Sequence, residues 1–108
     1  MKLAKVIAII RPEVLERVEE KLKQFGVPGV SVSQVKGYGE YADFYRSDWK
    51  MSHTRVEVVT SIEKSEPTAK VIIDAAHTGL QGDGIVTITP ISALYHIRSK
   101  KLCDTDPG

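Results

Sequence analysis

The order in which two kinds of hydrophobic pattern follow one another is the strongest constraint on how this chain folds. Runs or alternations of apolar residues predict strands, and apolar residues spaced three to four positions apart predict helices. The predicted strands cover residues 3–10, 30–36, 55–60 and 85–89. One helix is predicted over residues 14–25, and a second starts after Ser65 or Glu66. The resulting order is strand, helix, strand, strand, helix, strand.

This order predicts the α+β class and a ferredoxin-like βαββαβ arrangement, in which two helices cover one face of an antiparallel sheet. Glycine and proline are expected to mark the ends of several elements. Pro12 and Pro67 suit the first turns of the two helices, Gly26 and Thr78–Gly79 suit the helix ends, and Pro90 is expected to stop the last strand. A polar and aromatic segment from Gly37 to about Thr54 separates the two middle strands, and loops of this length are usually functional or disordered.

Composition narrows the class of protein further. The chain is 42% apolar, and its 15 lysines and arginines nearly balance 14 aspartates and glutamates. This suits one compact domain with a modest core, which oligomerisation would enlarge. The balanced charge indicates neither a nucleic-acid surface nor a membrane anchor, and no apolar run approaches the ~20 residues that span a bilayer. Since Cys103 is the single cysteine, no intrachain disulfide is possible, and we expect a cytoplasmic location.

Two glycine-rich segments are the strongest candidates for a binding site. They are Gly37-Tyr38-Gly39, at the end of the second strand, and residues 78–84 (Thr-Gly-Leu-Gln-Gly-Asp-Gly), before the fourth. Glycine admits left-handed backbone conformations, so successive N–H groups can form an anion-binding concavity. The alternative is that these glycines only make tight turns, and their spacing alone does not name a ligand.

Five stretches of this sequence together resemble the P-II signalling family. They are residues 9–12 (Ile-Ile-Arg-Pro), 29–39 (through Val-Lys-Gly-Tyr-Gly), 56–59, 76–84 and 90–98, in unbroken order over about residues 1–99. The resemblance implies a homotrimer of one ferredoxin-like domain, residues 1–99, with the family's T-loop at about 38–54 and its B-loop at about 78–84. Residues 100–108 are then a polar C-terminal tail, which we expect to be mobile.

The resemblance also implies an adenine-nucleotide site in each cleft between neighbouring subunits. Arg98 would reach in from the adjacent subunit and neutralise phosphate charge, because its fork of donors matches phosphate oxygens. His96 stands where the family has a second arginine, and it would donate to phosphate when protonated. The remaining implied site residues are Gly37, Tyr38 and Gly39 at the T-loop base, Glu57 beside the adenosine, and Thr78, Gly79, Gly82, Asp83 and Gly84 around the phosphates.

Departures from the family pattern shape the expected ligands. Ile85 replaces the lysine that usually follows Gly-Asp-Gly, and His96 replaces an arginine, so we expect either that ADP or AMP binds better than ATP or that all three bind weakly. Tyr41 and His53 stand where the family has a glutamine and a lysine that hold Mg-ATP and 2-oxoglutarate, which argues against 2-oxoglutarate sensing. Such P-II-like variants are associated with bicarbonate uptake and heavy-metal efflux, so bicarbonate or another small anion is a candidate effector.

The resemblance therefore implies a regulatory binding module. An enzyme is not indicated, because no nucleophile has a base partner at a motif spacing. The T-loop residues Tyr45, Arg46 and Trp49 are expected to contact a protein partner, most simply a membrane transporter, through a nucleotide-dependent ordering of the loop. The alternative for these aromatics is packing against their own trimer. The alternative function is a trimeric metal-binding or metal-tolerance protein that uses His53, His96 or Cys103. Cys103 itself is expected to be a solvated thiol. The regulatory function requires no metal.

Overall fold

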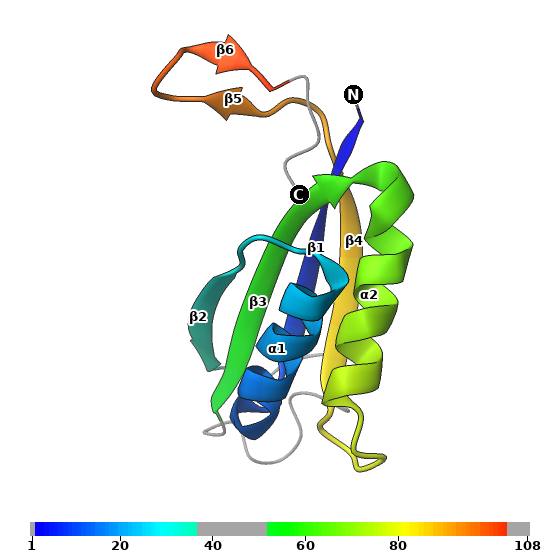
Figure 1. Ribbon diagram of the computed structural model, residues 1–108. Coiled ribbons are helices and arrows are strands. Elements are labelled where there is room, and N and C mark those ends of the chain that lie inside the picture. The colour runs from blue at the N-terminus through cyan, green and yellow to red at the C-terminus, as the bar shows by residue number, and fades with distance from the viewer. Residues whose placement is uncertain (1, 37–51, 104–108) are drawn as a thin grey trace.

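A computed structural model describes residues 2–36 and 52–103. Its elements are β1 (Leu3–Ile10), the short 3-10 turn η1 (Pro12–Val14), α1 (Leu15–Phe25), β2 (Ser31–Lys36), β3 (Ser52–Ser61), α2 (Ile62–Ala76), β4 (Gly84–Ile91), β5 (Tyr95–His96) and β6 (Lys101–Leu102) (Figure 1). The expected α+β class and βαββαβ order are confirmed. None of the helices in the described ranges is both long and apolar enough to cross a bilayer.

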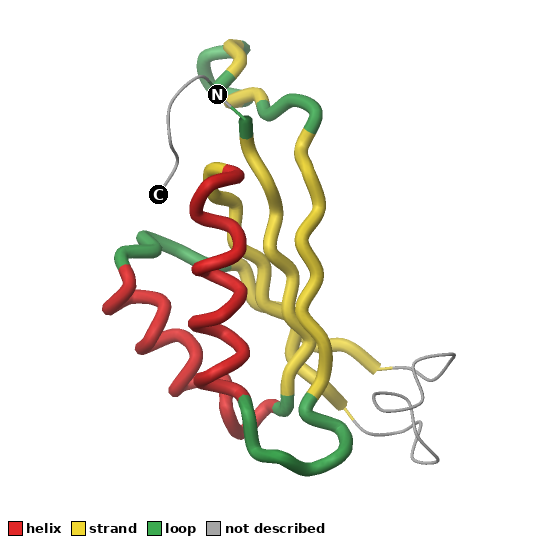
Figure 2. The backbone as a smooth tube through the Cα atoms, turned by 90° about the vertical axis from the view of Figure 1, so that its right-hand side faces the viewer, coloured by secondary structure: helices red, strands yellow, loops and turns green. Residues whose placement is uncertain are grey.

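The main sheet has the strand order β2-β3-β1-β4, and each neighbouring pair is antiparallel. Both helices lie on one face of this sheet (Figure 2), as the sequence predicts. The strand register brings the ends of all four strands to the same end of the sheet. Ile10 lies between Thr54 and Gly84, and Thr54 is also paired with Gln34. The segments that follow β2 and precede β4 therefore start from the same end of the sheet.

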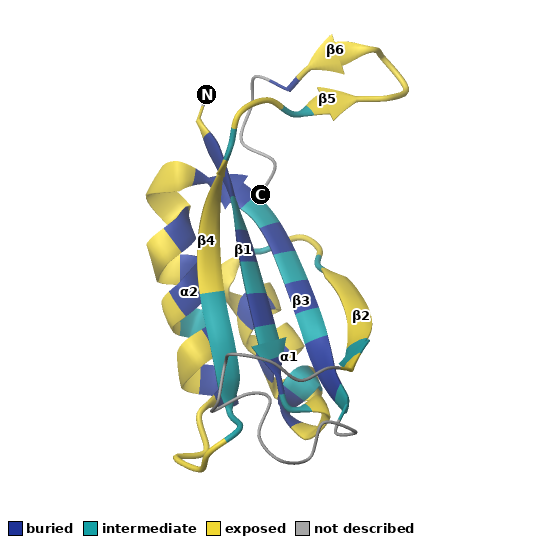
Figure 3. Cartoon of the chain, turned by 180° about the vertical axis from the view of Figure 1, so that it is seen from behind, coloured by how far each residue is buried: buried dark blue, intermediate teal, exposed yellow. Residues whose placement is uncertain are grey.

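Alternation along β1 and β3 places the core between the sheet and the helices. Val6, Ala8 and Ile10 are buried against Val56 and Val58, while the residues between them are only half-buried. Figure 3 shows this alternation on the sheet face that the helices do not cover. The helices contribute Val18, Leu22 and Ile72 to the core. Each fully buried aliphatic side chain of this size stabilises the fold by about 1.5–3 kcal/mol.

The end of α1 agrees with the sequence, since Gly26 adopts φ 106° and donates its N–H to the carbonyl oxygens of Leu22 and Lys23. The start of α2 does not: the helix begins at Ile62, so Pro67 lies inside it. The buried stripe of α2 includes Ser65 and Thr68, two polar residues that an apolar pattern omits. The helix also ends at Ala76, two residues before the predicted Thr78–Gly79 stop, with His77 as an extended cap.

Two strand limits also differ from expectation. Pro90 does not stop β4, which continues to Ile91. β4 is an edge strand that pairs only with β1 among the strands of this sheet, and edge strands are where a sheet tolerates proline. β3 begins at Ser52 rather than Arg55, because polar residues such as His53 and Thr54 are buried there.

The C-terminal part of the described chain forms a small hairpin that the sequence did not reveal. Strands β5 and β6 pair antiparallel, with Tyr95 opposite Leu102 and His96 opposite Lys101. β6 therefore lies within the segment predicted to be a mobile tail. Cys103 follows it, is buried, and donates its N–H to the Leu94 carbonyl oxygen at 2.7 Å, so the expectation of a solvated thiol was wrong.

Candidate functional site

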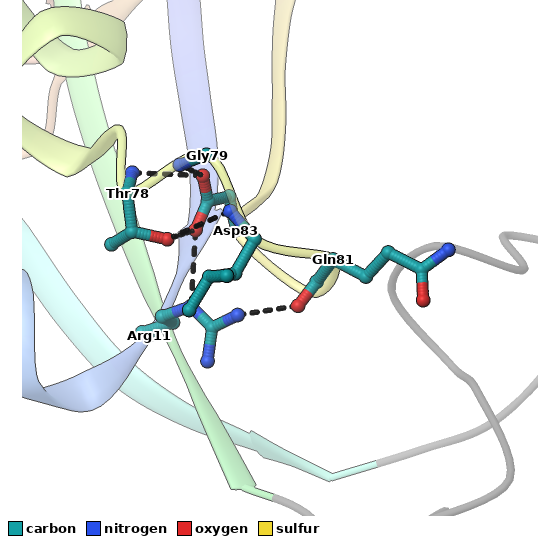
Figure 4. A network of polar contacts seen from close by, with 6 residues as sticks. Arg11, Thr78, Gly79, Gln81 and Asp83 are labelled. Carbon is teal, nitrogen blue, oxygen red and sulfur yellow. Dashed lines mark hydrogen bonds and ion pairs between the residues drawn. The ribbon is translucent and has the colours of Figure 1, made fainter.

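The loop that joins α2 to β4 is organised around one carboxylate. Asp83 accepts hydrogen bonds from the backbone N–H of Thr78 at 2.9 Å, the backbone N–H of Gly79 at 3.0 Å and the Arg11 Nε–H at 3.0 Å. The Thr78 hydroxyl also donates to it. Figure 4 shows these donors converging on the Asp83 side chain. Aspartate thus fills an anion-binding concavity of the loop with a group from the chain itself.

These donors hold the pKa of Asp83 far below its ordinary value of 3.8. The Thr78 hydroxyl is the largest cause and the Thr78 amide the next; Arg11 and the Gly79 amide add to them, while burial opposes the shift. Each donor favours the charged form of the carboxylate, which therefore stays ionised at neutral pH. A bound phosphate would have to tolerate this fixed negative charge and rely on amides beyond Gly79.

Arg11 is a site residue that the sequence analysis missed. It follows directly after β1 and crosses to the loop, where its Nε–H reaches Asp83 and an Nη2–H donates to the Gln81 carbonyl oxygen (Figure 4). Its side chain is 17% exposed, so the pair is partly shielded from water. The two partners are 72 positions apart, and the sequence signal for Arg11 was its place in the 9–12 stretch (Ile-Ile-Arg-Pro) that resembles the family pattern.

Two of the predicted glycines require their lack of a side chain for different reasons. Gly79 has φ +87°, and a Cβ there would meet nothing nearer than His77 Cε1 at 3.8 Å. Gly84 has φ +107°, and a Cβ there would lie 1.7 Å from the Ile9 carbonyl oxygen. The loop therefore returns to β1 by a close backbone approach that only glycine permits.

Glu57 lies on the sheet face that the helices leave uncovered. It forms ion pairs with Lys5 Nζ at 3.2 Å and with Arg55 Nη2 at 3.0 Å. Ile7 lies beside it in register on β1. This places an acidic side chain between two cations on the uncovered sheet face, next to the half-buried Ile7.

His96 and Arg98 do not approach the 78–84 loop within one chain. His96 lies in β5 and Arg98 in the connection to β6, which project from the end of the molecule opposite the loop (Figure 1). The eight residues of β4 separate the two ends, a span of about 25 Å. A site that uses both groups must therefore draw them from different chains.

Several predicted residues fall outside the described part of the chain. They are Gly37, Tyr38, Gly39, Tyr41, Tyr45, Arg46 and Trp49. Lys36 is the last described residue before them, at the sheet end that carries Gly84.

The metal-ligand candidates are not brought together. His53 is buried within β3 opposite Val35, whereas His96 and Cys103 belong to the hairpin region at the other end. Within residues 2–36 and 52–103, no three His, Cys, Asp or Glu side chains gather in a way that could hold a metal ion.

A hollow of about 320 Å³ adjoins the loop on its helix side. Asp83 and Gly84 line one edge of it, and most of its wall is aliphatic, from residues such as Ile10, Ile73 and Val86. Such a wall offers little to neutralise phosphate charge, so the cations of a phosphate site must come from elsewhere.

Comparison with known proteins adds an independent line of evidence. A family model described as "Nitrogen regulatory protein P-II" matches residues 3–101. A nitrogen regulatory protein P-II of Azospirillum brasilense is 34% identical over 88% of this chain and 91% of its own length. The nitrogen regulatory protein GlnK2 of Haloferax mediterranei is 35% identical over 89% of this chain and 84% of its own length. A crystal structure of Arabidopsis thaliana PII bound to citrate superposes with a TM-score of 0.80 at 31% identity, covering 95% of this chain and 90% of that one.

Proposed function

Because this chain belongs to the nitrogen regulatory protein P-II family, we propose that it is a signal-transduction protein that binds an adenine nucleotide where two subunits meet. One observation carries the proposal: the 78–84 loop is already ordered around Asp83 at the sheet end from which the loop after β2 also departs. A ligand held at this end would touch both segments.

The surface chemistry of the single chain supports assembly into a homotrimer. The uncovered sheet face carries Ile7, Ile9 and Val59 in half-buried positions, where further burial against another copy would remove apolar area from water. The β5–β6 hairpin leaves Ile97 and Tyr95 exposed, at 93% and 64%. An isolated two-stranded hairpin is marginally stable in water, so we expect it to pack on a neighbouring subunit. That packing would deliver Arg98 and His96 to the neighbour's phosphate loop.

ADP or AMP is the nucleotide that this site would favour over ATP. Ile85 follows the Gly-Asp-Gly turn and brings no charge, and the Asp83 carboxylate adds a negative one. Each further phosphate of a nucleotide increases the charge that Arg98 and His96 would have to neutralise. A small anion such as bicarbonate is a candidate second effector; the Arabidopsis relative was crystallised with citrate, also an anion.

The output of the site would be a change in the loop between β2 and β3. Lys36 ends β2 and Ser52 begins β3, and both lie at the ligand end of the sheet. Nucleotide contact there would order the loop, which would engage or release a membrane transporter through Tyr45, Arg46 and Trp49. Ordering of a segment by a ligand is a common mode of switching.

Calorimetric titration with AMP, ADP and ATP tests the proposal. The unmodified protein should bind ADP or AMP at least as tightly as ATP, and Arg98→Ala should weaken ADP binding by about tenfold or more, since one charge-assisted contact is lost. Light scattering should show that the variant remains a trimer.

The matched control is Lys23→Ala, which removes a cation from the exposed surface of α1, away from the loop and the hairpin. It should leave all three affinities unchanged. A monomeric protein that binds no adenine nucleotide would refute the proposal. Tenfold tighter binding of ATP than of ADP would refute the expected selectivity, and an unchanged affinity in Arg98→Ala would refute the role of that residue.

A further inference from the structure

Arg11 stands between two parts of the candidate site. It follows Ile10, whose register partners are Thr54 at the start of β3 and Gly84 at the start of β4. From this central position its guanidinium bonds to the Asp83 carboxylate at 3.0 Å and to the Gln81 carbonyl oxygen. One side chain thus links the end of the central strand to two points of the phosphate loop.

The other contacts of Asp83 are local to the loop. Thr78 and Gly79 lie within five positions of Asp83, so their bonds set the internal shape of the loop without attaching it to the sheet. Gly79, Gly82 and Gly84 all have positive φ, and of these three glycines Gly84 is held against β1 by its pairing with Ile10 and its close approach to the Ile9 carbonyl oxygen. The Arg11 contacts attach the loop to the end of β1 at a second place, through Asp83 and Gln81, and so oppose local opening of residues 78–83.

We propose that Arg11 is a positioning residue of the phosphate loop: through Asp83 and the Gln81 carbonyl it fixes the loop against β1 before a ligand arrives. This inference deepens the proposed function and rests on it for the identity of the ligand. Preordering the loop lowers the conformational entropy lost on binding, so it increases affinity without a direct contact. The role requires arginine in particular, since its fork of donors reaches a carboxylate and a carbonyl together.

Hydrogen exchange of the nucleotide-free protein tests the positioning role directly. In Arg11→Met, the hydrogen-bonded amides of Thr78, Gly79 and Leu80 should exchange about tenfold faster, the effect expected for one charge-assisted bond at a partly exposed site. Arg11→Lys should give a smaller increase, because an ammonium is a single point donor. Amides in the middle of β1 and β4 should keep their protection, which separates loop release from general unfolding.

Arg17→Met provides the matched control. Arg17 also crosses from α1 to the second half of the chain, where its Nε–H donates to the Ala75 carbonyl oxygen at 2.6 Å in α2. Its loss should speed exchange in the last turn of α2 and leave the amides of residues 78–80 near their original rates. Equal acceleration by Arg11→Met and Arg17→Met would contradict the proposal.

A double-mutant cycle shows whether Arg11 acts through Asp83. Arg11→Met should weaken ADP binding about tenfold in the unmodified chain but clearly less in an Asp83→Asn background. Faster loop exchange with unchanged ADP affinity, or equal losses in both backgrounds, would overturn the inference. If the unmodified protein bound no nucleotide, the proposed function would fail, while the exchange data would still decide whether Arg11 holds the loop.

Discussion

Replacing Gly84 by alanine should destabilise the fold far more than the same change at Gly79 or Gly29. At Gly84 two separate penalties coincide. The φ of +107° is unfavourable for a residue with a Cβ, and that Cβ would lie 1.7 Å from the Ile9 carbonyl oxygen and 2.8 Å from its carbon. Both of these atoms belong to the backbone of the central strand, so no side chain can rotate away to make room.

The size of the effect follows from adding the two terms. A left-handed conformation costs a residue with a Cβ about 1–2 kcal/mol. Forcing extra volume into a packed site typically costs about 1–3 kcal/mol, and a contact this short with backbone falls at the upper end. The sum of about 3–5 kcal/mol is a large share of the roughly 5–15 kcal/mol that stabilises a small domain. A melting temperature lower by about 15 °C or more is expected.

Two other glycines separate the terms. Gly79→Ala meets the backbone penalty alone, because the nearest atom to its Cβ would be His77 Cε1 at 3.8 Å, and it should lower stability by about 1–2 kcal/mol. Gly29→Ala meets neither penalty, since its Cβ would have no neighbour within 4 Å, and it should stay within about 0.5 kcal/mol. Urea unfolding followed by circular dichroism, at one protein concentration, measures all three. Equal losses for Gly84→Ala and Gly79→Ala would refute the reasoning.

Two further predictions concern the charges of the loop. Asp83→Asn should destabilise the protein by about 2 kcal/mol at pH 7, because the amide cannot accept from all the donors. Since the folded-state pKa of Asp83 is depressed, its contribution is present above the ordinary value of 3.8 and is lost as pH falls below it, so unfolding measured near pH 3 should show a smaller gap than at pH 7. Ile85→Lys should improve ATP affinity about tenfold, and AMP affinity less, because it restores a cation beside the Gly-Asp-Gly turn; equal gains for both nucleotides in calorimetry would contradict this.

Most of the fold was predictable because its core follows simple periodicities. Alternation in β1 and β3 and the stripe of α1 identify their buried faces without further information. Two errors in the element limits came from treating proline as a terminator. Pro67 lies inside α2 and Pro90 lies inside β4. The cost of the missing N–H depends on whether the proline lies in an early helical turn or in an edge strand. That environment exists only once the strands and helices are assembled.

The site was predictable only in part for a similar reason. The glycines of residues 78–84 indicate an unusual loop, and Gly84 lies where the backbone passes close to the Ile9 carbonyl oxygen. The bond between Arg11 and Asp83 joins positions 72 residues apart in the sequence, and no local pattern encodes it. The β5–β6 hairpin was missed because its two-residue strands are too short to show a period.

The β5–β6 hairpin and the 78–84 loop lie at opposite ends of the chain. If each cleft takes its loop from one subunit and its arginine from the next, the number of working sites depends on the interfaces between subunits and not on the number of chains. Chains defective at one end would then be complemented by chains defective at the other, since a mixed ring still contains junctions where two sound halves meet. Dilution that dissociates the subunits would abolish ligand binding even if every individual chain stayed folded.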